Sequence, residues 1–131
     1  MKNLTLIIGA VYGLFAVILG AFGAHTLKER IDPAELAIWS KGVEYQFYHV
    51  FALLFLSTLN SAQNKFVNYA YWFFMLGIVF FSGSLYLLAT REISNIQSLN
   101  IIGPITPLGG LFFIIGWCML FVAALKHNDP N

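Results

Sequence analysis

Charged side chains are scarce in this 131-residue sequence, since Asp, Glu, Lys and Arg together make up 10% of it, against about 25% in soluble domains. Hydrophobic residues make up 59% and the mean hydropathy is +0.75. These values exclude a water-soluble globule. The seven Lys and Arg residues are scattered and the net charge is +1, so we expect no nucleic acid partner, because phosphate binding needs concentrated basic residues.

Cysteine is also nearly absent, and so are catalytic motifs. Cys118 is the single cysteine, which excludes an internal disulfide and a CxxC metal or redox motif. It stands in an apolar run, where we expect it to pack. The sequence contains no phosphate-binding loop, dinucleotide-binding glycine pattern or nucleophile elbow. We therefore expect no cofactor, no metal and no catalytic residue, and we predict that the protein is not an enzyme.

What the sequence does contain is four long uncharged stretches. They predict membrane spans at about residues 4–25, 43–61, 66–90 and 103–125, each close to the ~20 residues that a helix needs to cross a bilayer. None shows the alternation of a barrel strand, and hydrogen bonding of the backbone in lipid favours helices. The first stretch is too long for a signal peptide. The predicted fold is all-α: a four-transmembrane-helix bundle forming a single membrane domain, 1–131.

The segment after the first span predicts a short interfacial amphipathic helix that leads into the second span. Asp32 can cap its free amides, Pro33 suits the first helical position, and Glu35 favours the positive helix end. Trp39 suits the level of the lipid headgroups. Gly42 offers a place for a bend.

The other two loops, 60–65 and 91–100, are brief and polar and leave no room for a catalytic domain. Lys and Arg residues divide almost evenly between the two sides of the predicted spans, so the positive-inside rule does not decide the orientation.

Polar residues gather in the half of the membrane that faces the first and third loops. We take these as a candidate binding or functional cluster: His25, Glu44, Tyr45, Gln46, His49, Ser82, Tyr86, Arg91, Pro104, Thr106 and Pro107. Tyr45, Gln46 and His49 share one helical stripe, whereas Glu44 and His49 are turned about 140° apart. A site in the membrane portion would open toward these loops.

His49 admits two interpretations, because an ionisable residue inside a span is costly unless it has a partner. It either donates a structural hydrogen bond, for example to Tyr86, a serine or a backbone carbonyl, or it carries a proton, a metal or a ligand. His25 ends the first span at a similar depth, so the two histidines could meet. For Glu44 we expect a salt bridge with Lys41, Arg91 or Arg30.

Small residues predict close helix packing in the first span. Gly9, Gly13, Gly20 and Gly23 form a stripe together with Ala16, and small residues let helix backbones approach in lipid. Packing within the chain and dimerisation both fit this stripe. Residues 82–84 (SGS) predict a second close contact or a mild kink.

The entry to the fourth span is the most restrictive segment. Pro104 and Pro107 remove amide donors and push the residues before them out of helical geometry. Either the entry is irregular or re-entrant, or the helix starts near Pro107 and 103–106 form an interfacial loop.

These motifs together resemble those of a known family. They are 20–25 (GAFGAH), 45–49 (YQFYH), 81–86 (FSGSLY) and 103–110 (GPITPLGG) followed by 116–117 (GW). The chain resembles domain-of-unknown-function family 423, a family of small bacterial inner-membrane proteins, over nearly its whole length. The resemblance implies a single four-span domain in the bacterial inner membrane. It implies no substrate, cofactor or catalytic residue.

Our first functional expectation is a non-enzymatic integral membrane protein that binds membrane lipid or a partner, or helps to maintain the envelope. The partner would be another membrane protein or a second copy of the chain. The alternative is a small solute or proton-linked transporter or channel that uses His49 with Glu44. A metal or redox membrane enzyme rests on His25 and His49 alone.

Overall fold

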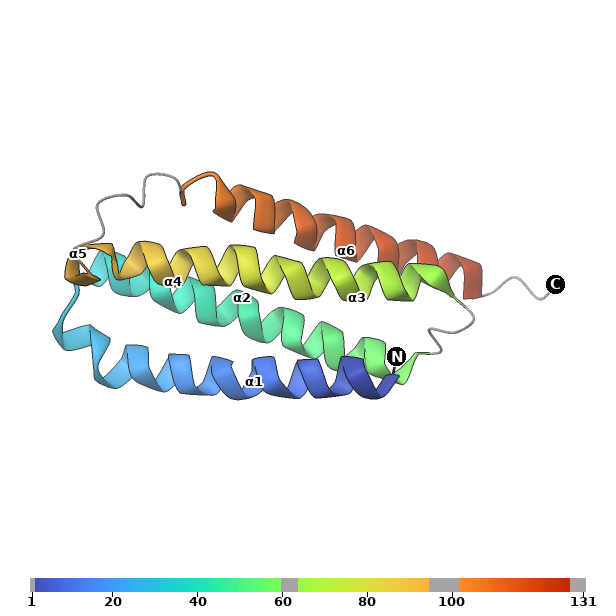
Figure 1. Cartoon of the computed structure of the whole chain (residues 1–131), viewed down its shortest axis with the longest axis horizontal. Helices are drawn as coiled ribbons and strands as arrows, with labels where there is room; N and C mark the ends of the chain where they lie inside the picture. Colours follow the sequence, from blue (N-terminus) through green and yellow to red (C-terminus); the bar gives the residue numbers. More distant parts are fainter. Residues whose placement is uncertain (1, 60–63, 95–101, 128–131) are drawn as a thin grey trace.

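The computed structural model describes residues 2–59, 64–94 and 102–127, and the regular structure of these residues is entirely helical (Figure 1). Three stretches are long and apolar enough to cross a membrane: Asn3–Glu29, Lys65–Ala89 and Ile105–Lys126. The all-α prediction is confirmed. The elements are α1 (Lys2–His25), the 3₁₀ turn η1 (Leu27–Glu29), α2 (Pro33–Thr58), α3 (Lys65–Gly77), the π-helical turn η2 (Ile78–Ser82), α4 (Gly83–Ala89), α5 (Arg91–Ser94) and α6 (Ile105–His127).

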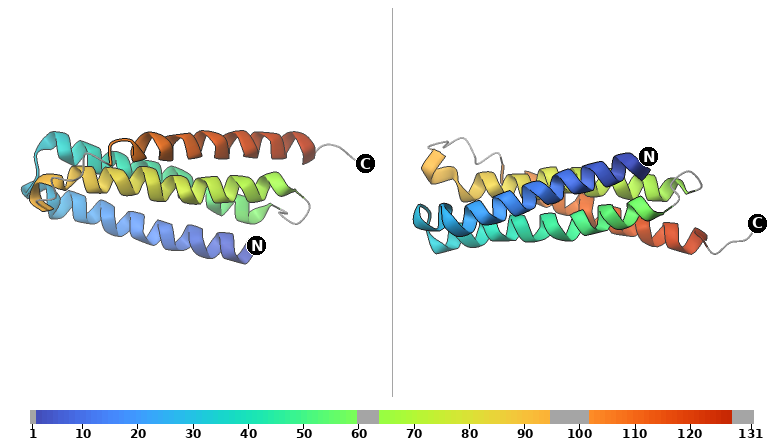
Figure 2. Two further views of the ribbon diagram at one scale, coloured as in Figure 1. Left: turned by 45° about the horizontal axis from the view of Figure 1, so that its top comes forward. Right: turned by 90° about the horizontal axis from the view of Figure 1, so that it is seen from below.

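The long helices form an open arrangement with two central and two edge members. α1 packs mainly against α2, α6 packs mainly against α3 and η2, and α2 packs against α4, η2 and α3. α1 and α6 therefore lie at opposite edges, as two views show (Figures 1 and 2). The main core lies between α2, α3 and α6 and includes Leu53, Phe74 and Phe113. A second, smaller cluster surrounds Trp39 at the end near η1.

The glycine stripe of α1 faces α2. A Cβ added to Gly9 would lie 2.9 Å from Leu54 Cδ2, and one added to Gly23 would lie 2.6 Å from the Trp39 ring. Gly13 faces Val50 and Gly20 faces Val43 in the same way. The stripe thus brings the backbones of α1 and α2 together within the chain.

The segment that we predicted as a short interfacial helix leading into the second span forms the first turns of α2, in one continuous helix with that span. The Asp32 side chain accepts a hydrogen bond from the Glu35 amide at 2.8 Å and caps the helix. The helix runs without a break through Gly42, whose missing side chain makes room for the ring of Tyr86. Trp39 does not face lipid: it is buried, and its Nε1 donates to the Leu19 carbonyl at 2.9 Å.

The third predicted span is one continuous helix whose middle is π-helical. In η2 the Gly83 amide donates to the Ile78 carbonyl five residues earlier, which is the π pattern. The predicted kink at 82–84 therefore corresponds to a π turn that begins four residues earlier. This turn brings the backbone of Phe81 against Gly109 of α6, so closely that a Cβ on Gly109 would overlap the Phe81 amide nitrogen.

The entry to α6 is a short turn and not a re-entrant segment. Residues 102–104 form a turn closed by the Ile105 amide, which donates to the Ile102 carbonyl at 2.9 Å, and the helix begins at Ile105. Pro107 is tolerated in the first turn because the amides there have no intrahelical acceptor in any case. The helix thus starts two residues before Pro107, close to the start that the second alternative gave, and the turn ahead of it ends before Thr106.

Two predicted loops fall partly outside the described residues. These are 60–65, of which Asn64 and Lys65 are described, and 91–100, of which 91–94 are described and form α5.

Candidate functional site

Gln46 is the centre of the buried polar contacts. It lies on α2 with about 4% of its surface exposed. Its Nε2 donates to the Tyr12 carbonyl of α1 at 2.8 Å, and its Oε1 accepts from the Tyr86 hydroxyl of α4 at 2.7 Å. One amide side chain therefore joins three helices and has both its oxygen and its nitrogen in hydrogen bonds.

Two serines beside the π turn extend this pattern. Ser82 is fully buried, and its hydroxyl donates to the Gly42 carbonyl of α2 at 2.7 Å. The Ser84 hydroxyl lies 2.6 Å from the Thr106 hydroxyl of α6 and also donates to the Phe81 carbonyl at 2.8 Å. The serines thus bond the third helix to both of its neighbours.

His49 faces the bundle interior, and both of its ring nitrogens have partners. Nδ1 lies 2.8 Å from the Tyr45 carbonyl of its own helix, and the Trp117 indole nitrogen of α6 donates to Nε2 at 3.2 Å. Because Nε2 accepts a hydrogen bond, we assign the ring proton to Nδ1, which gives a neutral imidazole. The ring also stacks on Phe113, with centroids 3.4 Å apart. The partners that we named for His49 do not include Trp117.

The predicted meeting of His25 and His49 is wrong. His25 is exposed at the end of α1. The residue of α1 that faces the level of His49 is Gly13, which contacts Val50. His25 lies about three turns, or roughly 18 Å, further along the helix.

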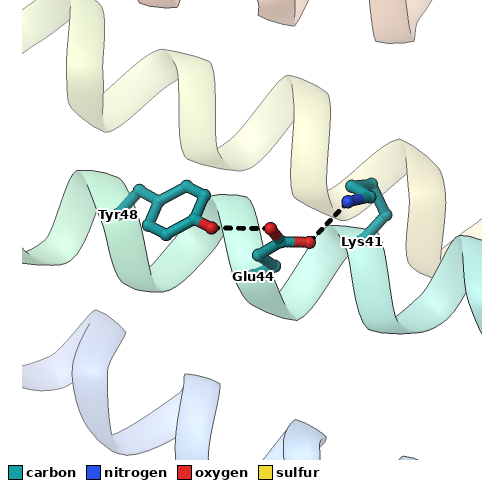
Figure 3. Close-up of polar contacts among 3 residues, drawn as sticks. All are labelled: Lys41, Glu44 and Tyr48. Carbon is teal, nitrogen blue, oxygen red and sulfur yellow. Dashed lines mark hydrogen bonds and ion pairs between the residues drawn. The ribbon is translucent and has the colours of Figure 1, made fainter.

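Glu44 lies on the outer face of α2 and not with His49. Its carboxylate accepts from Lys41 Nζ and from the Tyr48 hydroxyl, both at 2.6 Å (Figure 3). Of the three predicted ion-pair partners, Lys41 is the one found. We call Lys41, Glu44 and Tyr48 the outer polar triad.

The remaining members of the predicted cluster divide between the interior and the surface. Tyr45 is half-buried and packs its ring against Phe81, with centroids 4.9 Å apart. Arg91, Pro104 and Pro107 are exposed. The structure thus brings together the residues on the inner face of α2 and the two helices beside it, and it leaves the loop residues apart.

Several important side chains were missed by sequence reasoning. Trp117 and Phe113 hold His49, yet in the sequence they are ordinary members of an apolar run. Glu35, which we considered for its place in the first helical turn, is buried. Cys118, for which we expected packing, is exposed. For Phe113, Trp117 and Cys118 the spacing of apolar residues gives no signal, because residues 108–125 of α6 are all apolar or glycine.

Metal binding has no geometric basis in the described part of the chain. Within residues 2–59, 64–94 and 102–127, no group of three or more His, Cys, Asp or Glu side chains lies close enough to hold a metal ion. The buried side chains of Gln46, His49, Ser82 and Ser84 bond to other side chains or to backbone carbonyls. Their arrangement is that of interhelical hydrogen bonds, which hold helices together in lipid.

Comparison with known proteins agrees with a membrane protein. The family model described as "Protein of unknown function (DUF423)" matches residues 19–110. The UPF0382 membrane protein SAB0533 of Staphylococcus aureus (strain bovine RF122 / ET3-1) is 44% identical over 95% of this chain and 97% of its own. The UPF0382 membrane protein YwdK of Bacillus subtilis (strain 168) is 46% identical over 93% of this chain and 96% of its own. No solved structure matches the chain.

Proposed function

The chain belongs to the DUF423 family, and from that premise we propose that it is a non-enzymatic protein of the bacterial inner membrane that binds lipid or a partner membrane protein. The binding surface would lie at the end where α1 and α4 stop and α2 begins. The observation that carries the proposal is the outer polar triad.

The proposal includes a fourth crossing by α2. This helix has 26 residues, about 39 Å at 1.5 Å per residue. It lies alongside α1 from the Gly9–Leu54 contact to the Gly23–Trp39 contact. The inner polar side chains in its middle part, Gln46 and His49, are hydrogen-bonded, so they do not have to face lipid. A helix so placed between apolar neighbours can cross the membrane despite its polar residues.

The outer polar triad stands at a depth where the neighbouring helix is apolar. Val43 faces Gly20, so Glu44 lies at the level of the part of α1 that exposes Ile18 and Phe22. Two and three turns deeper than Glu44 on the same face of α2, Phe51 and Phe55 are exposed. Charged groups in such a position need polar groups around them at the membrane surface. A lipid headgroup or a polar partner protein supplies such groups.

The geometry favours binding over transport. The transport alternative uses His49 together with Glu44, but His49 is buried in its neutral form and Glu44 is bonded on the outer face. A proton carrier has to gain and lose its proton along a path. Here the Trp117 N–H occupies the nitrogen that would receive it.

The test is retention of lipid and protein by the purified chain. We expect native mass spectrometry to show bound lipid or a partner on the wild type, with less on the double variant Lys41→Met, Tyr48→Phe. The matched control is Lys65→Met, which removes an exposed lysine at the opposite end. The same molecules at the same occupancy in all three proteins would contradict the proposed surface.

A further inference from the structure

A buried carboxylate without a partner lies at the same end of the molecule. Glu35 has about 6% of its surface exposed, and its Oε1 is buried and accepts no hydrogen bond within the described ranges 2–59, 64–94 and 102–127. Its own amide donates to Asp32 at 2.8 Å. The side chain, unlike that of Glu44, has no basic residue paired with it among the described residues.

Glu35 points into the bundle and away from the outer polar triad. It lies one turn before Trp39 and two turns before Gly42, and all three are buried on one stripe of α2. Trp39 packs with Leu27 of η1 and Ala89 of α4 in the smaller cluster. The Glu35 side chain thus lies on the stripe of α2 that faces this cluster, near the end where α1 and α4 terminate.

An ionised carboxylate in this position needs a donor. Its place in the first turn of α2 stabilises negative charge to a small extent. Leaving a buried charged group without its hydrogen bonds costs more than the helix dipole supplies. The helix dipole thus does not offset the burial. The C-terminus of α1 and that of α4 lie at this same end, and the dipole of each helix adds negative potential there.

We propose that Glu35 binds the primary ammonium group of a membrane lipid headgroup. An ammonium supplies both positive charge and three N–H donors, one of which would serve Oε1. A multivalent metal ion fits less well. Calcium takes six to eight oxygen ligands, and in the described part of the chain Glu35 does not belong to any group of three or more His, Cys, Asp or Glu side chains that could hold a metal ion. The headgroup phosphate would meet the exposed basic residues Lys28, Arg30 or Arg91. The inference rests on the proposed function in one respect, that the chain binds lipid.

The test compares headgroups that differ only in their N–H donors. Purified protein in detergent is titrated with short-chain phosphatidylethanolamine, its N-trimethylated counterpart phosphatidylcholine, or phosphatidylglycerol, and the melting temperature is followed. We expect phosphatidylethanolamine to bind at least tenfold more tightly than the other two. Because ligand binding stabilises by mass action, it should give the largest rise in melting temperature. This comparison uses the wild type and does not depend on any variant folding.

The variant arm uses Glu35→Gln, which keeps the size of the side chain and removes its charge. The preference for phosphatidylethanolamine should disappear in Glu35→Gln and persist in Glu29→Gln, which changes an exposed carboxylate at the same end. Equal rises with all three lipids would overturn the ammonium site while leaving lipid binding intact. No rise with any lipid would count against lipid binding itself. If free ethanolamine raises the melting temperature as strongly as the lipid does, the ligand is a soluble amine, and the proposed lipid headgroup is overturned. If calcium raises the melting temperature of the wild type but not of Glu35→Gln, the site binds a metal ion, and the proposed ammonium site is overturned.

Discussion

The buried polar residues of this protein connect neighbouring helices through hydrogen bonds. Gln46 connects α2 to α1 and α4, Ser82 connects the π turn to α2, and His49 connects α2 to α6. In a membrane, apolar side chains gain little by leaving lipid for a neighbouring helix, so such bonds and close packing supply much of the association. Each of these hydrogen bonds also fixes the rotation of the connected helices about their axes, because its donor and acceptor have definite directions.

We predict that Gln46 and Tyr86 are energetically coupled. Gln46→Leu removes bonds to two helices, whereas Tyr86→Phe removes one. Gln46→Leu should therefore destabilise more, by about 1–3 kcal/mol if the Tyr86 hydroxyl and the amide site lose their partners. The measurement is reversible unfolding in mixed detergent, done as a double-mutant cycle. Since each variant removes the same Tyr86–Gln46 bond, the double variant should cost less than the sum of the two. Strict additivity would mean that the bond contributes nothing.

The sequence predicted that His49 has a polar partner and so faces inward, and a backbone carbonyl, one of the partners that we named, is found at Tyr45. It did not predict the contacts of His49 with α6. The inward direction follows from the cost of an imidazole in lipid. The partner depends on which residue of α6 reaches the same depth, and α6 is apolar throughout, so its sequence marks no buried face. His49 meets Trp117 and Phe113 only when α2 and α6 have one particular offset along their axes. The two residues that share the hydrogen bond, His49 and Trp117, are 68 positions apart in the sequence. No local pattern carries that information.

At the scale of helices, the π turn explains why α6 can approach so closely. η2 widens the third helix at Ile78–Ser82, and Gly109 lies directly against the backbone of Phe81 there. Gly77 on one side and Gly116 on the other face Phe113 and Phe74 without room for a side chain. The interface of α3, η2 and α6 is thus a close contact of glycines with rings and backbone.

The neighbouring glycines 109 and 110 provide a matched test of this contact. Gly109→Ala would drive a methyl group into the Phe81 backbone, which cannot move aside as a side chain can, and should destabilise by about 1–3 kcal/mol. Gly110→Ala meets only the Phe81 ring at 3.8 Å and should be neutral or stabilising by up to about 1 kcal/mol, since alanine favours helix over glycine. Thermal unfolding in detergent compares the two. If both variants melt alike, the backbone contact at Phe81 is not as close as described.

The α1 stripe gives the corresponding prediction at the other edge. Gly13→Leu should separate α1 from Val50 of α2, because a Cβ at this position would already lie 3.3 Å from Val50 Cγ1 and the rest of the leucine side chain is larger. The change should lower the free energy of unfolding by about 1–3 kcal/mol or more. Val17→Leu is the control, since Val17 is 59% exposed on the outer side of the same helix. Melting temperature in detergent is the measurement. A protein that tolerates both changes equally would have no close packing through Gly13.

At the scale of the whole molecule, charge spacing predicted where helices lie but not how they are offset. The helix ends agree within a few residues for α1 and for Lys65–Ala89. α2 begins ten residues before the span predicted from charges, because Asp32 and Pro33 start it and nothing interrupts it. α6 begins well short of the end that α2 and α4 reach (Figure 1). This offset depends on the Ser84–Thr106 and Phe81–Gly109 contacts, which no sequence pattern reports.

The number of crossings is the property of the whole molecule that follows from whether α2 spans the bilayer. Four crossings would place both chain termini on the same side of the membrane, and three would place them on opposite sides. We expect the same side, because α2 packs against both α1 and the third helix and its inner residues Gln46 and His49 are already hydrogen-bonded. The measurement is the sidedness of a small reporter attached to one terminus or the other in intact cells, with Cys118→Ser removing the exposed native thiol if labelling is used. Reporters on opposite sides would show that α2 lies at the surface. The outer polar triad would then not stand at membrane depth.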